Sequence, residues 1–248
     1  MKTFKILISG DKACFTRPEM KAERVSYDVP TPGAIEGLLK SVYWKPAIRY
    51  MIDKIIIFNP IEFMSVRRNE VKSKIAYNKM KKQMLESKVD MDNIVTDPRV
   101  YVDKERTQRA SLILKNVKYG IEFHMEQTGI QCEREKKECN PQVKHEQEFQ
   151  RRCEKGQWFR MPCLGCSEFP ADIKLVEDFE LSEVSKENMG EHDLGFMLYK
   201  VVFKDKGHPI KNDWNNKMFS DEAESVFYRP KMIDGIIDVQ QYRGTKVC

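Results

Sequence analysis

Residues 27–42, YDVPTPGAIEGLLKSV, contain the clearest helix signal in the chain. Thr31 is a favourable N-cap residue, and Pro32 suits the first helical position, where its missing N–H is not needed. Four apolar residues then recur at helical spacing and form one face: Ile35, Leu38, Leu39 and Val42. Because a residue before proline disfavours helical backbone, Pro46 limits the predicted helix to roughly residues 32–44.

The sequence on both sides of this helix has the patterns of β-strands. Residues 3–9 alternate and are β-branched, and residues 53–64 contain a continuous apolar run that predicts a buried strand. Residues 110–125 predict either one long strand or a hairpin-like pair. Asn140-Pro141 then starts a second helix of about 15 residues, which Gly156 ends.

The order of these elements is typical of one α+β arrangement. Strand, helix, strand, strand, helix and strand follow one another, which is the βαββαβ order of ferredoxin-like (RRM-like) domains. We predict this domain over residues 1–175 and a smaller C-terminal antiparallel β-sheet extension over residues 176–248. Residues 67–92 lack a strong apolar face and predict a basic helical insertion.

Composition excludes several classes of protein. Hydrophobic residues make up 41% of the 248 residues and charged residues 33%, too apolar for a disordered chain and too charged for a membrane protein. No run approaches the ~18 apolar residues of a membrane helix, and the apolar stretch after Met1 is too short for a secretory signal. We expect a soluble, cytoplasmic protein with no membrane partner.

The seven cysteines have no disulfide-framework spacing and are expected to be free thiols. A zinc site formed by Cys132, Cys139, Cys163 and Cys166 is the alternative, but the first pair has six residues between its members and no knuckle turn. No zincin, P-loop, Rossmann or nucleophile-elbow motif is present. We therefore predict neither a metal nor a cofactor.

Positive charge is concentrated in residues 67–82. Seven basic residues accompany only Glu70, so this block has a net charge of +6, whereas the whole chain has +5. The basic residues are Arg67, Arg68, Lys72, Lys74, Lys79, Lys81 and Lys82. Such a block on a near-neutral chain is typical of phosphate binding by a nucleic-acid-binding protein, although a solvated helix face has the same composition.

Four histidines are present, and one of them has a suggestive position. His145 follows Lys144 in the first turns of the predicted 141–155 helix, where backbone N–H groups favour an anion. A cation beside a titratable imidazole suits RNA transesterification, although a surface Lys-His pair is the simpler interpretation. His124 lies on a predicted strand and is expected to be structural, and we expect no role for His192 or His208.

Several blocks of the sequence resemble one CRISPR-associated family. They include Gly10-Asp11-Lys12-Ala13-Cys14-Phe15-Thr16-Arg17-Pro18-Glu19, Tyr43-Trp44-Lys45-Pro46, Phe149-Gln150-Arg151-Arg152 and Leu164-Gly165-Cys166-Ser167-Glu168-Phe169-Pro170-Ala171. In this order they are similar to the Cas-five family of the subtype I-C (Dvulg) CRISPR system, in the RAMP superfamily of RNA-binding proteins. The resemblance runs over nearly the whole chain and departs from the family pattern around residues 126–143.

The resemblance implies an activity and its catalytic residues. The family cleaves CRISPR precursor RNA within each repeat without a metal, near the base of the repeat hairpin, and leaves a 5′-hydroxyl and a 2′,3′-cyclic phosphate. The protein then stays on the 5′ handle of the crRNA as a subunit of Cascade, beside the backbone and large subunits. The family's catalytic Tyr, Lys and His correspond to Tyr43, Lys144 and His145.

The residues expected to contact RNA are basic or aromatic. Those chosen for the backbone are Arg17, Lys21, Arg24, Arg67, Arg68, Lys72 and Lys74, and Trp44 leads the candidates for base stacking, with Trp158 and Phe159 beside it. For each aromatic residue alone, core packing is the simpler role, and Tyr43 itself has a packing alternative. The rival function is a non-catalytic subunit that only binds the 5′ handle of the crRNA.

Overall fold

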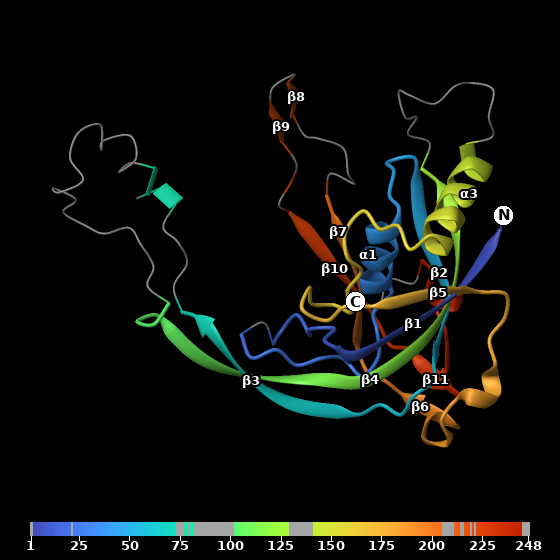
Figure 1. Cartoon of the computed structure of the whole chain (residues 1–248), viewed down its shortest axis with the longest axis horizontal. Coiled ribbons are helices and arrows are strands. Elements are labelled where there is room, and N and C mark those ends of the chain that lie inside the picture. The colour runs from blue at the N-terminus through green and yellow to red at the C-terminus, as the bar shows by residue number, and fades with distance from the viewer. Residues whose placement is uncertain are drawn as a thin grey trace. The chain divides into compact units, whose positions relative to one another are not determined.

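The computed structural model describes residues 2–20, 22–72, 77–78, 80–81, 102–128, 141–204, 211–213, 216–218, 220 and 222–244. The chain divides into two compact units (Figure 1). The large unit contains Met1–Met64 and Leu112–Cys248, and the small unit contains Ser65–Ser111. The fold is α+β, because strands form most of the described elements and two α-helices have full bounds within them.

A sheet of antiparallel pairs forms the centre of the large unit. Its first four strands lie in the order β5-β1-β4-β2, and every neighbouring pair among them is antiparallel. Their bounds are β1 Thr3–Ala13, β2 Ile48–Ile57, β4 Arg106–Gln127 and β5 Asp172–Val176. Beyond β2 the sheet continues through three short strands, β12 Ile236–Asp238, β11 Lys231–Ile233 and β6 Glu191–Asp193.

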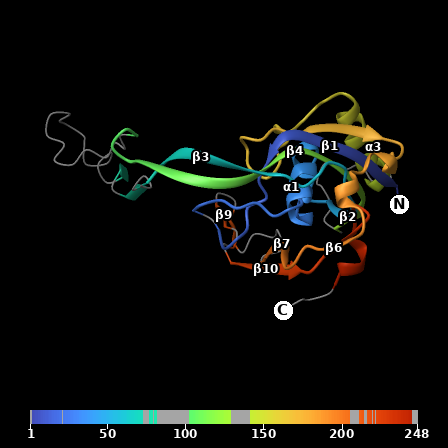
Figure 2. The same cartoon turned by 90° about the horizontal axis from the view of Figure 1, so that it is seen from below.

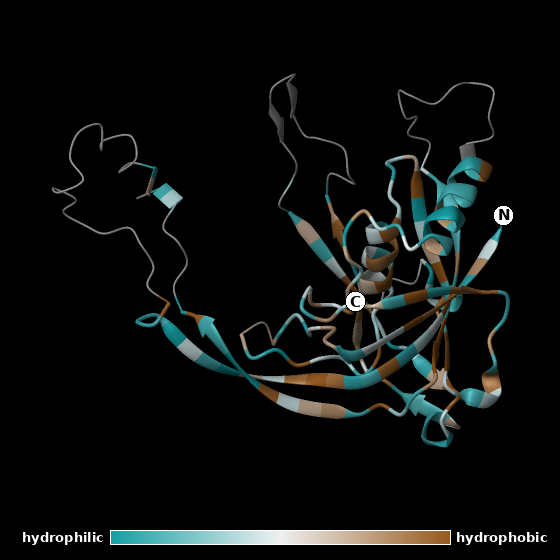
Figure 3. Ribbon diagram, in the orientation of Figure 1, coloured by the Kyte–Doolittle hydropathy of each residue, from teal (hydrophilic) through white to brown (hydrophobic). Residues whose placement is uncertain are grey.

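The helix signals in the sequence are confirmed. Helix α1 spans Pro32–Val42, and the side chain of Thr31 caps it by accepting a hydrogen bond from the N–H of Ala34 at 3.2 Å. Helix α3 spans Pro141–Glu154, and Gly156 follows it with φ +59°, as a helix-ending glycine does. Figure 3 shows that α3 is mostly hydrophilic, so few of its residues enter the core.

Both helices cover the same face of the sheet (Figures 1 and 2). Phe149 of α3 is fully buried between Phe4 of β1 and Phe123 of β4, with ring centroids 5.4 Å apart in each case. Phe4 and Phe123 are themselves register partners, which puts their side chains on one face. Because a buried aromatic residue contributes about 3 kcal/mol or more to stability, this packing holds α3 on the sheet.

Most of the regular elements in the described part of the C-terminal third are strands, as its sequence pattern predicts. Strands β7 (Met197–Phe203) and β10 (Ala223–Tyr228) form an antiparallel pair, and β8 (Lys211–Asp213) pairs with β9 (Asn216–Met218). Three 3₁₀ helices complete the described elements: η2 Leu181–Glu183, η3 Lys186–Asn188 and η4 Gln240–Tyr242.

Two predictions about the middle of the chain meet different outcomes. Residues 110–125 lie within one long strand, β4, so the single-strand alternative is confirmed. Asn116 has a left-handed backbone (φ +49°) at the position where a hairpin would need its turn, but the strand continues through it. The helical prediction for residues 67–92 is wrong over 67–71, which belong to strand β3 (Phe63–Val71). Alternating exposed and half-buried residues and pairing with β4 outweigh the helix-forming composition there.

The described part of the small unit consists mainly of two strand segments. Ser65–Val71 of β3 and Arg106–Ser111 of β4 lie in it, and the N–H of Lys72 donates to the carbonyl of Glu105 at 2.8 Å. Tyr77, Asn78, Met80 and Lys81 are helical, and the rest of the predicted insertion lies outside the described residues. None of the described helices of the chain is long and apolar enough to span a membrane.

Candidate active site

Tyr43 and His145 meet although their positions in the sequence differ by 102. The hydroxyl of Tyr43 lies 2.7 Å from Nδ1 of His145, which is a short hydrogen bond, and the ring centroids are 5.9 Å apart. Both side chains are buried, with 5% of Tyr43 and 1% of His145 exposed. The structure therefore brings together two of the three residues predicted to be catalytic.

The position of Tyr43 follows from the way in which α1 ends. Its N–H still donates to the carbonyl of Leu39, but its backbone is extended (φ −150°, ψ 131°), so the chain leaves the helix at this residue. The carbonyl of Tyr43 accepts a hydrogen bond of 2.5 Å from the hydroxyl of Tyr50 on β2. Burial raises the pKa of Tyr50 well above its usual value, so this hydroxyl keeps the proton that it donates.

Lys144 differs from the buried pair in its exposure to solvent. It is exposed, whereas His145, the next residue of α3, is buried. Consecutive residues of an α-helix point about 100° apart, so a cation and an imidazole at adjacent positions reach one phosphate only from two sides. The described residues include no group of three or more His, Cys, Asp and Glu side chains arranged to hold a metal ion.

Arg152 is a further member of the site. Its guanidinium lies over the ring of Tyr43, with the carbon 5.4 Å from the centroid, and donates to the carbonyl of Val42 at 3.2 Å. Its Nε also donates to Glu148 at 3.0 Å. Hydrogen bonds from Arg151 and then Arg152 lower the pKa of Glu148 to about 2, so Glu148 is a carboxylate that holds both cations.

Arg152 was not among the residues predicted to be functional, although its spacing from His145 in the sequence indicates a shared helix face. Arg152 is seven residues after His145, and side chains spaced by seven lie on the same face of an α-helix. A helix face with His145 at one end and Arg152 two turns later is therefore visible in the sequence. The missing information was that the end of α1 packs against that face.

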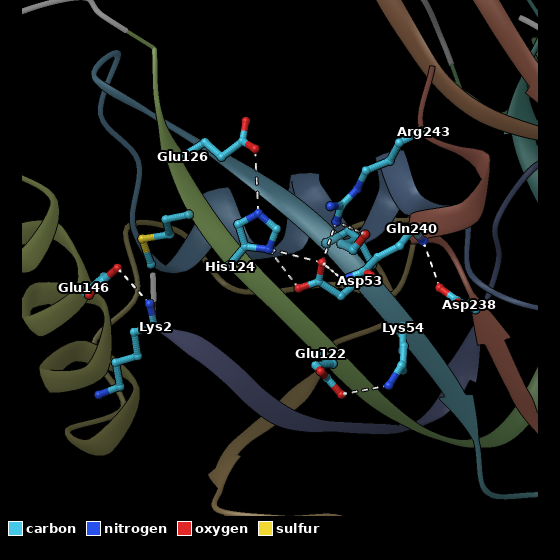
Figure 4. A network of polar contacts seen from close by, with 12 residues as sticks. Lys2, Asp53, Lys54, Glu122, His124, Glu126, Glu146, Asp238, Gln240 and Arg243 are labelled. Carbon is cyan, nitrogen blue, oxygen red and sulfur yellow. Dashed lines mark hydrogen bonds and ion pairs between the residues drawn. The ribbon is translucent and has the colours of Figure 1, made fainter. Parts of the chain in front are cut away.

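The other histidines lie in separate surroundings. His124 of β4 contacts the buried carboxylate of Asp53, with its Nδ1 2.9 Å from Oδ2, in a network that includes Gln240 and Arg243 (Figure 4). His192 contacts the carbonyl of Met189 through Nε2 at 2.9 Å. His208 lies outside the described residues, as do Cys132, Cys139 and Cys248.

The predicted RNA-binding residues of the large unit are in varied environments. Trp44 is 52% exposed directly after Tyr43. Arg17 is paired with Asp28 at 3.2 Å and lies over the ring of Tyr27, whereas Arg24 contacts Cys166 and Glu168. Lys21 lies outside the described residues.

The small unit contains the remaining residues predicted to bind RNA. Arg67 and Lys72 are exposed, and Arg68 is half-buried and paired with Glu70 at 3.3 Å. Glu70 is also 3.5 Å from Arg109, so it neutralises part of the charge of this strand pair. Lys74 lies outside the described residues.

These observations define an α+β protein with a mostly antiparallel sheet, two helices on one face and a Tyr–His pair buried between the helices. The model of the family described as CRISPR-associated protein (Cas_Cas5), Cas5d, matches residues 3–240. The chain belongs to this family.

Two similar relatives are both named CRISPR pre-crRNA endoribonuclease Cas5d. The protein from Mannheimia succiniciproducens is 39% identical over 246 residues, which cover 98% of this chain and 97% of that protein. The protein from Thermus thermophilus is 34% identical over 210 residues, which cover 84% of this chain and 78% of that protein.

Two solved structures share the fold. One, described as a CRISPR-associated protein, has a TM-score of 0.58 at 22% identity and covers 96% of this chain and 91% of its own. The other, a functionally uncharacterized protein from Streptococcus mutans, has a TM-score of 0.57 at 22% identity and covers 95% of this chain and 91% of its own. The described mixture of helices and antiparallel strands is thus a known architecture.

Proposed function

We propose that this chain is an endoribonuclease that cleaves CRISPR precursor RNA within each repeat and leaves a 5′-hydroxyl and a 2′,3′-cyclic phosphate. The names of the two relatives support this activity, and the matched regions cover most of each. The observation that carries the proposal is the 2.7 Å hydrogen bond between Tyr43 and His145. It joins a phenol to an imidazole, the side chain that most often transfers protons in enzyme active sites.

The pair has the chemistry that the reaction needs. A 2′-hydroxyl of the RNA attacks the adjacent phosphorus and the 5′-oxygen leaves, so one group must take a proton and another must give one. A proton can pass along the hydrogen bond between the Tyr43 hydroxyl and Nδ1 of His145, so the pair performs both tasks. Lys144 and Arg152 contribute positive charge for the oxygens of the phosphorane-like transition state.

RNA binding has to open the site. With 5% of Tyr43 and 1% of His145 exposed, a phosphate reaches the pair only after neighbouring side chains move. Arg152 is suited to be one of them, because its interactions with Tyr43, Val42 and Glu148 exchange readily for hydrogen bonds to a phosphate. The exposed Lys144 then approaches the same phosphate from the other side.

The bound RNA extends beyond the scissile phosphate. We propose that Arg17, Lys21, Arg24, Arg67, Arg68, Lys72 and Lys74 contact its backbone and that Trp44 stacks on a base, as the sequence predicts. After cleavage the protein remains on the 5′ handle as a subunit of the type I-C Cascade complex, in contact with the backbone and large subunits. We also propose that the protein acts in the cytoplasm.

The alternative is a non-catalytic subunit that binds the 5′ handle of the crRNA. The burial of Tyr43 and His145 favours it, because buried Tyr and His side chains joined by a hydrogen bond are also a packing feature. The two proposals differ in one measurable property, which is cleavage of repeat RNA by the purified chain.

We also propose that the fold consists of a ferredoxin-like domain and a C-terminal β-sheet extension. The strand order β5-β1-β4-β2, with α1 after β1 and α3 after β4, supports a ferredoxin-like domain over residues 1–175. The strand pairs β7–β10 and β8–β9 lie outside the central sheet and support a C-terminal β-sheet extension over 176–248, whereas β6, β11 and β12 continue the central sheet.

The test uses repeat RNA in excess EDTA. Because the nucleophile belongs to the RNA, we expect cleavage at an unchanged rate, whereas RNA with 2′-deoxyribose at the nucleotide 5′ of the cut should bind and stay intact. RNA with the deoxyribose two nucleotides away is the matched control and should be cut. Loss of cutting in EDTA, or cutting of the first deoxy substrate, would overturn the mechanism, and binding without any cutting would favour the structural subunit.

A further inference from the structure

The segment Cys163-Leu164-Gly165-Cys166 lies against the residue that follows β1. The carbonyl of Leu164 accepts a hydrogen bond of 3.0 Å from the N–H of Cys14. Gly165 has φ +85°, and a Cβ built on it would lie 2.0 Å from the carbonyl oxygen of Cys14, so the close approach requires glycine. The sulfur of Cys166 is consequently 3.8 Å from the same carbonyl oxygen.

Charged and polar groups surround the two thiols. Nη1 of Arg24 donates to the sulfur of Cys166 at 3.2 Å, and Glu168 is 3.9 Å from the same Arg24 nitrogen. On the other side, the sulfur of Cys14 is 3.5 Å from the hydroxyl of Thr16. The cluster thus consists of two thiols, one cation and one carboxylate, and both cysteines are free.

The two thiols differ in acidity. A hydrogen bond from the thiol of Cys14, with Arg24 next to it, lowers the pKa of Cys166 to about 6, against the opposing effects of partial burial and Glu168. The same hydrogen bond and burial raise the pKa of Cys14. Because Arg24 donates to the sulfur of Cys166, the thiolate, which is the nucleophilic form of cysteine, is favoured on Cys166 rather than on Cys14.

The two thiols also differ in access. Cys166 is half-buried on a loop, whereas Cys14 is 1% exposed. A small oxidant arriving from solvent reaches Cys166 first, and the sulfur of Cys166 lies 3.8 Å from the backbone carbonyl oxygen of Cys14. A reactive thiolate with a second thiol beside it is the usual arrangement of a reversible thiol oxidation site.

We propose that Cys166 is a hydroperoxide-reactive thiol and that Cys14 resolves its oxidised form. The thiolate of Cys166 attacks a hydroperoxide ROOH, so an S–O bond forms, the O–O bond breaks and the leaving RO⁻ takes a proton to become ROH. The sulfur becomes a sulfenic acid, oxidised by two electrons, while the peroxide is reduced. The sulfur of Cys14 then displaces the hydroxyl group, which leaves as water with the thiol proton, and a Cys14–Cys166 disulfide results.

The first experiment treats the full chain with hydrogen peroxide and maps every cysteine by mass spectrometry without reduction. We expect a Cys14–Cys166 disulfide that dithiothreitol reverses. In Cys14→Ser, dimedone should trap a sulfenic acid on Cys166, and in Cys166→Ser, Cys14 should remain a thiol. Cys153 is the matched control, because burial raises its pKa to about 12 and it should stay unmodified.

The second experiment measures the rate of iodoacetamide alkylation of each cysteine in the unmodified chain. The rate at Cys166 should rise with a midpoint below about pH 8.5, where a free cysteine typically titrates, and Arg24→Met should lower the rate at pH 7 by at least about fivefold. Equal rates at Cys163 and Cys166 at pH 7, or a peroxide-induced disulfide that joins Cys166 to Cys163, would overturn the proposal. RNA cleavage is not used as a readout, so these results stand apart from those on the nuclease.

Discussion

Lys144 and His145 are neighbours in the chain but differ in their environments. His145 is buried and hydrogen-bonded to Tyr43, whereas the side chain of Lys144 is exposed. A substitution at each position therefore removes a different function. In the proposed mechanism His145 transfers a proton and Lys144 contributes charge to the scissile phosphate.

His145→Ala should lower the rate of repeat-RNA cleavage by at least about 100-fold, because positioned proton transfer typically contributes ~10²–10⁴-fold. RNA affinity should remain nearly unchanged, since phosphate contacts dominate binding.

Tyr43→Phe and Lys144→Ala should also slow cleavage, and each combined with His145→Ala should give less than the product of the single effects. Single-turnover cleavage and filter binding measure the two quantities, with His192→Ala as the control. Near-normal cutting by His145→Ala would exclude its catalytic role.

Arg152→Met should slow cleavage by about tenfold or more, since one charged hydrogen-bonding group on a transition state is typically that important. Met keeps the length of the aliphatic stem but cannot donate to Val42 or Glu148. Arg152→Lys should retain part of the activity, because an ammonium group can still lie over the ring of Tyr43. Arg151→Met is the matched control, because Arg151 binds the same carboxylate, Glu148, and its loss should leave the cleavage rate nearly unchanged. An unchanged single-turnover rate in Arg152→Met would limit this residue to packing.

The ends of α1 and α3 were predictable from sequence because local chemistry determines them. Thr31 and Pro32 fix the start of α1, and Gly156 follows α3 with the left-handed backbone that other residues avoid. The pairing of Tyr43 with His145 was not predictable from local pattern, because it depends on how both helices pack on the sheet. The resemblance to a known family named both residues, but their burial is visible only in the structure.

Strand β3 marks the limit of composition as a guide. Residues 67–71 are rich in helix-forming charged residues, yet their hydrogen bonding with β4 makes them a strand. Tertiary pairing outweighs propensity here, since strand preference depends on neighbours more than on the residue itself. Because alternate residues of a strand face opposite sides, the basic residues in this strand do not share one face as they would on a helix.

Charge reversal of Lys79, Lys81 and Lys82 should weaken RNA binding and flatten its salt dependence. For every phosphate that the variant no longer binds, the slope of log affinity against log salt concentration should fall by roughly 0.7–0.9. We expect the basic block to bind at least two phosphates, and Arg67→Glu with Lys72→Glu gives a second variant whose residues are both exposed. Lys186→Glu, in the acidic segment 177–193, is the control. An unchanged slope in both block variants would make this block a solvated surface.

One buried carboxylate connects three distant parts of the large unit. Asp53 of β2 is 2% exposed and is contacted by His124 of β4, Gln240 of η4 and Arg243, which follows η4 (Figure 4). Arg243 also donates to the carbonyl of Ile52 at 2.7 Å. Helix η4 and Arg243 are thereby connected to the central sheet through one side chain.

The protonation of Asp53 makes this connection dependent on pH. Burial, the largest influence, raises the pKa of Asp53, but hydrogen bonds from His124, Gln240 and Arg243 together outweigh it and lower the pKa below the usual value. A carboxylate with a depressed pKa in the folded state stabilises the protein fully above its unfolded pKa of about 3.9. That contribution is lost as the pH falls through the folded pKa.

Asp53→Asn should therefore destabilise the chain at pH 7 by about 3 kcal/mol, because it removes one partner of a buried ion pair and leaves the others without their counter-charge. Asn has the shape of protonated Asp, so the free energies of unfolding of the two proteins should converge as the pH falls below about 4. Urea denaturation between pH 2.5 and 7 measures both curves. Glu222→Gln is the control, because its ion pair with Lys204 is exposed on both sides and should contribute less than about 1 kcal/mol. A gap between the Asp53→Asn and unsubstituted proteins that stays constant down to pH 2.5 would mean that packing at Asp53, not its charge, holds the C-terminal segment in position.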